Sequence, residues 1–99
     1  MPTFTLAVSV RLDAVPDDDV VDALGRLLRP GDDDLLVWRD GDPAVLRLST
    51  DCAAVDLEDA VAVGLELGDD ALALCACPGA VQEVVAMDDE RQLVWRAEP

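Results

Sequence analysis

Three cysteines, Cys52, Cys75 and Cys77, carry the most nucleophilic side chains in this sequence. Cys75 and Cys77 could give two thiolates to a metal ion, but a structural zinc site needs four ligands, usually cysteine or histidine. The chain has one further cysteine and no histidine. On a helix, residues two apart point about 200° away from each other, so this pair would not grip one ion. The sequence therefore predicts small buried thiols, with no metal site and no cofactor.

Acidic residues form short runs that could bind a cation. The runs lie at residues 17–19, 32–34, 40 and 42, 69–70 and 88–90. None of them has the alternating acids, central glycine and distal glutamate of a calcium-binding loop. Each run coincides with a predicted helix end or turn, so we expect these acids to cap and solvate the elements.

Glu83 is the one acid inside an apolar stretch, with Val81 before it and Val84 and Val85 after it. On the buried face of a strand it would be a candidate acid–base group, and on the solvated face an ordinary surface carboxylate. The chain has no histidine, no tyrosine, no serine elbow and no glycine-rich phosphate loop. We therefore predict no catalytic residue, and an enzyme of unknown reaction type stays only as an alternative.

The first half of the chain shows both the strand and the helix periodicity. Residues 3–12 alternate between apolar and polar side chains, which predicts a half-buried strand. Residues 17–19 are three aspartates, and the apolar residues that follow them up to residue 28 have helical spacing, with Pro30 and Gly31 as the stop. Residues 35–39 and 44–49 flank a turn at residues 40–43, which predicts a hairpin. Residues 50–56 are expected to be a linker.

The stretch after Asp56 allows two interpretations. One is a single helix from Leu57 to about Ala76, capped by Asp56, because alanine and leucine favour helices. The other ends the helix at Gly68 and makes residues 71–77 a strand, because glycine costs about 1 kcal/mol inside a helix. We favour the long helix. Residues 81–87 and 92–97 then flank a polar loop and predict a second hairpin.

The predicted order is strand, helix, strand, strand, helix, strand, strand. Its first six elements resemble the split βαβ pattern of the ferredoxin-like fold. The resemblance implies one α+β domain over residues 1–99, a two-layer sandwich with both helices on one face and the sheet order 5-4-1-3-2. Because this fold supports many unrelated functions, the resemblance extends to the fold alone.

The tetrapeptide Leu-Val-Trp-Arg occurs twice, at residues 36–39 and 93–96, on the two predicted edge strands. Four residues are too few to indicate a duplication. In a strand, leucine and tryptophan of each copy share one face, and valine and arginine share the other. If the leucine and tryptophan face the helices, Arg39 and Arg96 face away from them.

Arg11 and Arg47 face away from the helices by the same alternation. Arg11, Arg39, Arg47 and Arg96 are therefore predicted to share the face of the sheet that no helix covers. Guanidinium groups recognise carboxylates and phosphates. We predict a non-catalytic interaction or regulatory module that forms a homodimer or docks a protein partner through this open face. The alternative is a domain that binds a small anionic ligand with these arginines.

The overall charge argues against two other classes of partner. The chain has 22 acidic residues against seven arginines and no lysine, with a formal net charge of −15. Such a charge repels nucleic-acid backbones and anionic membrane surfaces. No apolar stretch is long enough to span a bilayer, and an odd number of cysteines is typical of reduced thiols. These features predict a cytoplasmic protein that binds neither nucleic acid nor membranes.

Overall fold

The computed structural model describes residues 1–28, 34–39, 41–42 and 44–97. It contains five strands and two helices in the order βαββαββ. The elements are β1 (Thr3–Leu12), α1 (Asp18–Leu28), β2 (Leu36–Arg39), β3 (Val45–Ala53), α2 (Leu57–Cys75), β4 (Gly79–Met87) and β5 (Gln92–Arg96). The stop predicted at Pro30 and Gly31, and positions 40 and 43 of the predicted turn, lie outside the described residues.

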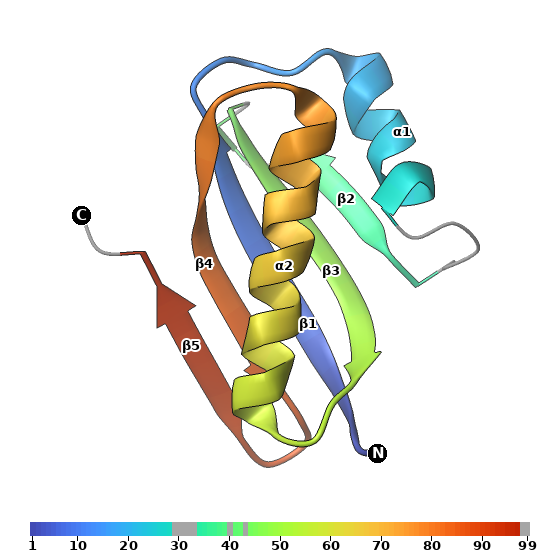
Figure 1. Ribbon diagram of the computed structural model, residues 1–99, viewed down its shortest axis with the longest axis vertical. Coiled ribbons are helices and arrows are strands. Elements are labelled where there is room, and N and C mark those ends of the chain that lie inside the picture. Colours follow the sequence, from blue (N-terminus) through green and yellow to red (C-terminus); the bar gives the residue numbers. More distant parts are fainter. Residues whose placement is uncertain (29–33, 40, 43, 98–99) are drawn as a thin grey trace.

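The five strands form one sheet in the order β2-β3-β1-β4-β5, and every pair of neighbours is antiparallel. Both helices lie on the same face of this sheet (Figure 1), with α2 over its centre and α1 beside β2. This arrangement confirms the predicted two-layer α+β sandwich and its sheet order. The opposite face of the sheet is covered by no described element, and we call it the open face.

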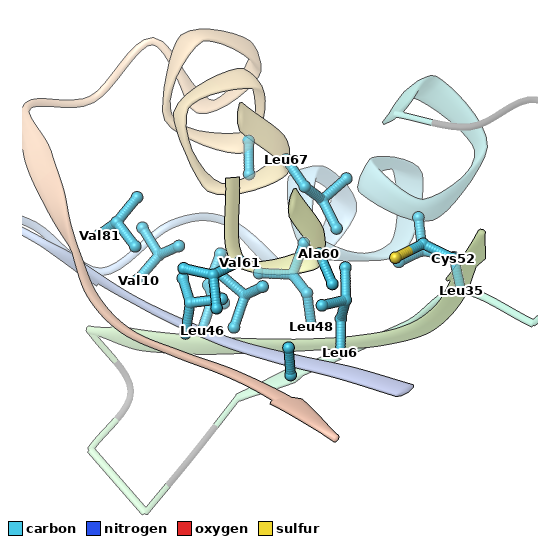
Figure 2. Packing of buried hydrophobic residues seen from close by; sticks show 14 of the residues in the cluster. Leu6, Val10, Leu35, Leu46, Leu48, Cys52, Ala60, Val61, Leu67 and Val81 are labelled. Carbon is cyan, nitrogen blue, oxygen red and sulfur yellow. The ribbon is translucent and has the colours of Figure 1, made fainter. Parts of the chain in front are cut away.

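Alternation along the strands produces the core between the two layers. The inward residues of β1 are almost fully buried: Phe4, Leu6, Val8, Val10 and Leu12. Figure 2 shows the inward side chains of the strands meeting those of α2, among them Ala60, Val61 and Leu67. Burial of this aliphatic surface supplies the main driving force for folding, since the chain contains only three aromatic residues, Phe4, Trp38 and Trp95.

Helix α2 is continuous from Leu57 to Cys75, which confirms the long-helix interpretation. Its first turn is closed by Asp56, whose Oδ1 accepts a hydrogen bond from the backbone N–H of Asp59 at 2.8 Å. Two glycines, Gly64 and Gly68, lie on its buried face, where the helix passes directly over the valines of the sheet. The glycine that argued for a break is thus required for close packing.

Strand β3 is longer than predicted, and the expected linker at residues 50–56 is wrong over residues 50–53. Thr50 pairs with Leu6, and Cys52 pairs with Phe4. The ten-residue β1 offers partners along its whole length, and pairing satisfies backbone groups that a buried linker would leave without hydrogen bonds.

The hairpin between β4 and β5 is confirmed, and Asp88 closes its loop. Asp88 Oδ1 accepts hydrogen bonds from the backbone N–H groups of Glu90 and Arg91, at 2.9 and 2.7 Å. These hydrogen bonds, with that of Glu90 first, lower the pKa of Asp88. The loop is therefore held by an ionised carboxylate.

Helix α2 is capped at its C-terminus by Ala76, the one described non-glycine residue with a positive φ, of 51°. Only glycine adopts this conformation without a steric cost. We expect Ala76→Gly to raise the free energy of unfolding by about 0.5–1 kcal/mol. Urea denaturation measures this change. Ala62→Gly, at an exposed position inside the same helix, should lower stability by about 1 kcal/mol. An equal loss of unfolding free energy in both variants would show that the left-handed conformation of Ala76 has no steric cost.

Candidate functional site

The strand register fixes which side chains lie together on the open face. One row crosses all five strands from β2 to β5 and consists mainly of apolar residues: Leu36, Ser49, Ala7, Val85 and Val94. We call it the apolar row. The next row contains the charged side chains: Trp38, Arg47, Ser9, Glu83 and Arg96. We call it the charged row.

The apolar row and the neighbouring Trp38 expose large hydrophobic side chains at the two edges of the sheet. Leu36 is 60% exposed, Trp38 42% and Val94 39%. The centre of both rows is occupied by small residues, Ala7, Ser9 and Ser49. The open face therefore has short side chains along its centre and large apolar side chains on its two edge strands.

A β-bulge in β4 changes the charged row. The pairing between β1 and β4 shifts at Ser9 and Val10, so that Val10 pairs with Val81 and Ser9 with Glu83. The extra residue is Gln82. A bulge lets two consecutive side chains of a strand point toward the same side, and Gln82 and Glu83 both line one hollow on the open face.

This hollow has a volume of about 440 Å³ and brings three of the predicted arginines together. Its walls include Arg11 from β1, Arg47 from β3 and Arg96 from β5, around the buried Ser9. The prediction that these three arginines lie on the open face is confirmed by their strand register.

Two carboxylates also line the hollow. Arg96 Nε lies 2.8 Å from Glu83 Oε2, and Arg11 Nη1 lies 3.2 Å from Asp42 Oδ2. Both pairs are substantially exposed to solvent, and such pairs contribute little to stability. Glu83 is thus on the solvated face of its strand, and its partner is an arginine of the neighbouring strand.

The prediction that Arg39 lies on the open face is wrong. Its partner in β3 is Leu46, which faces the helices, and its Nη2 lies 2.7 Å from Asp18 Oδ1 of α1. The same nitrogen donates a hydrogen bond to the carbonyl of Pro16. Arg39 therefore ties the edge strand β2 to the start of α1, with its charge at the rim of the helix layer.

Sequence reasoning missed the exposed Leu36 and Trp38 because four consecutive apolar residues, 35–38, give no alternation. Leu35 is buried against the helices, which turns Leu36 and Trp38 outward. One sequence feature does indicate the outward orientation of Leu36. Asp34 is an exposed acid two positions before it and therefore lies on the same side of an extended chain.

Charge is distributed unequally between the two layers. Helix α1 carries three exposed acids and one arginine, and α2 carries five exposed acids and no basic residue. The strands place three arginines, Arg11, Arg47 and Arg96, and two acids, Asp51 and Glu83, on the open face. The open face is therefore the part of the described chain where positive charge is concentrated.

The cysteines lie away from this face. Cys52 is buried in the core, and Cys75 and Cys77 are partly buried at the end of α2. Burial, and then the neighbouring Cys77, raise the pKa of Cys75, so its reactive thiolate form is disfavoured at neutral pH.

The described residues contain no group of three or more histidine, cysteine, aspartate or glutamate side chains placed to hold a metal ion. None of the described helices is long and apolar enough to cross a membrane.

Comparisons with protein-family models, with curated proteins and with solved structures gave no match for this chain.

Proposed function

We propose that this protein is a non-catalytic interaction module that self-associates through the open face of its sheet. The observation that carries the proposal is the exposure of Leu36, Trp38 and Val94 at the margins of that face. Contiguous exposed apolar surface marks sites that meet a partner, and Leu36 and Trp38, two residues apart on β2, form such a surface on the open face. The small residues between these margins, Ala7 and Ser49, would allow a second surface to approach closely.

A second copy of the chain suits this face better than an unrelated partner. The charged row contains both signs, with Arg47 and Arg96 on either side of Glu83, so it can complement itself across a two-fold axis. Face-to-face pairing also keeps the acidic helices of the two copies on the outside, far from each other. This separation reduces the repulsion expected between two chains of net charge −15.

The area of the face predicts a weak dimer. Five strands make a sheet about 24 Å wide, and strands of four to ten residues are about 13–33 Å long. Two such faces would bury on the order of 1,200 Å² in total, which is the lower limit for a stable interface. We therefore expect dissociation in the micromolar range.

Sedimentation velocity across the micromolar range tests this proposal. The wild-type chain is expected to change from monomer to dimer as its concentration rises. Leu36→Ser combined with Val94→Ser should raise the dissociation constant by about tenfold or more, because it removes two of the three large apolar side chains that the open face exposes. Arg47→Glu should also weaken the dimer, because the charged row would then contain two acids and one arginine and could no longer complement itself.

The matched control is Leu27→Ser, which removes a leucine of similar exposure, 58%, from the helix layer. This variant should dimerise like the wild type. A wild-type chain that stays monomeric at the highest concentration would refute the proposal, and so would a dimer that Leu27→Ser disrupts as strongly as the double variant.

A further inference from the structure

The hollow at the bulge is built differently from the rest of the open face. The bulge turns two polar side chains, Gln82 and Glu83, into the same space, where regular pairing would turn only one. Ser9 forms the floor and is almost completely buried, so the longer side chains around it rise as walls. Bulges of this kind are frequent beside binding and active sites because they re-aim side chains.

Arg11 and Arg96 keep N–H donors for a ligand. Arg96 donates to Glu83 through Nε, and Arg11 donates to Asp42 through Nη1, whereas a guanidinium offers five N–H donors. Glu83 accepts through Oε2, which leaves Oε1 as an acceptor in the described contacts. The hollow therefore presents positively charged N–H donors of arginine beside a negatively charged carboxylate acceptor.

The charges decide which ligand fits. Three arginines and two carboxylates, Glu83 and Asp42, line the hollow, and the rest of the chain is strongly acidic. A purely anionic ligand would meet both carboxylates at short range and the field of the whole chain at long range. A ligand with one carboxylate and one ammonium group complements both kinds of side chain and carries no net charge.

We propose that this hollow binds a small zwitterion such as a free α-amino acid. The ligand carboxylate would lie against the guanidinium groups of Arg11, Arg47 and Arg96, and its ammonium group against Glu83. A volume of about 440 Å³ is within the range of small-molecule sites, about 300–1,000 Å³. Every side chain that the proposal uses comes from one copy of the chain, so a monomer can bind the ligand, and a second copy on the open face would compete with it for Arg47, Glu83 and Arg96.

Thermal unfolding with single α-amino acids at millimolar concentration tests the proposal. The comparison probes are the N-acetyl derivative of each amino acid, its amide, succinate and inorganic phosphate. At least one free amino acid is expected to raise the Tm by about 5 °C, because a ligand that binds only the folded state stabilises it. Its acetylated and amidated forms should shift the Tm much less, since each lacks one of the two charges.

Glu83→Gln gives opposite results for the two kinds of ligand. It should reduce the shift caused by an amino acid, because the partner of the ammonium group is lost, whereas it would increase binding of a plain anion. Arg96→Gln should abolish the shift. Arg26→Gln, on the exposed surface of α1, is the matched control and should keep it.

A second measurement uses the wild-type chain alone. Amide chemical shifts on adding the amino acid should change around Ser9, Gln82 and Ala97, and not at Leu67 on the buried face of α2. The proposal is refuted if no amino acid shifts the Tm, if succinate or phosphate shifts it equally, or if Glu83→Gln strengthens binding. Sedimentation of the chain without amino acid tests self-association separately.

Discussion

Replacing both Gly64 and Gly68 by alanine should lower the free energy of unfolding by about 2–3 kcal/mol, although alanine is the better helix former. A Cβ atom at Gly64 would lie 2.5 Å from Val84 Cγ1, and one at Gly68 would lie 2.6 Å from Val81 Cγ2. Both valines are buried and branched, so their methyl groups cannot swing aside. The helix would have to move away from the sheet, which would loosen the packing over β4.

Gly25→Ala is the matched control for this prediction. Gly25 lies in α1, and the nearest atom to its added Cβ would be the Leu35 carbonyl oxygen at 3.8 Å, an ordinary contact. Here alanine should raise stability by up to about 1 kcal/mol. Urea denaturation of the three chains gives the comparison. Stabilisation by the α2 substitutions as well would mean that no close approach constrains that helix.

Leu24→Ala should lower the free energy of unfolding by about 3 kcal/mol, because it opens a cavity where α1 meets the sheet. Leu24 is 0% exposed, and Val21 is the only other buried residue that α1 contributes within its described range. Hydrogen exchange should show the amides of α1 losing protection before those of β1, since the helix has few other buried contacts.

Leu27→Ala tests whether this loss reflects burial. It makes the same substitution in the same helix, three residues along, at a side chain that is 58% exposed. We expect a change within about 0.5 kcal/mol. Equal destabilisation by both variants would show that helix propensity, and not packing, decides the stability of α1.

Local patterns predicted most of the architecture. The ten alternating residues of β1 defined a half-buried strand, and Asp56 defined the start of α2. The end of β3 was missed because Asp51 and Ala53 are poor strand formers, although the buried Thr50 and Cys52 continue the alternation of the strand. Residues 50–53 are held by pairing with β1, which is distant in the sequence.

Alternation along single strands predicted only part of the candidate site. Alternation placed Arg11 and Arg47 on the open face, since each lies between buried leucine or valine neighbours. It did not reveal the bulge at Gln82, because an extra residue in β4 exists only relative to the register of β1. The hollow that the bulge helps to form therefore could not be predicted.

The two Leu-Val-Trp-Arg segments separate what the sequence determines from what the tertiary structure decides. Both segments form edge strands, and the polar residue before the second, Gln92, already places its tryptophan inward. The first segment follows the apolar Leu35, so its pattern allows either face. Burial of Leu35 beneath α1 turns Trp38 outward and Arg39 toward the helix layer. The physical reason is that the side chains of a strand alternate, so the contact that anchors one residue determines the face of every other.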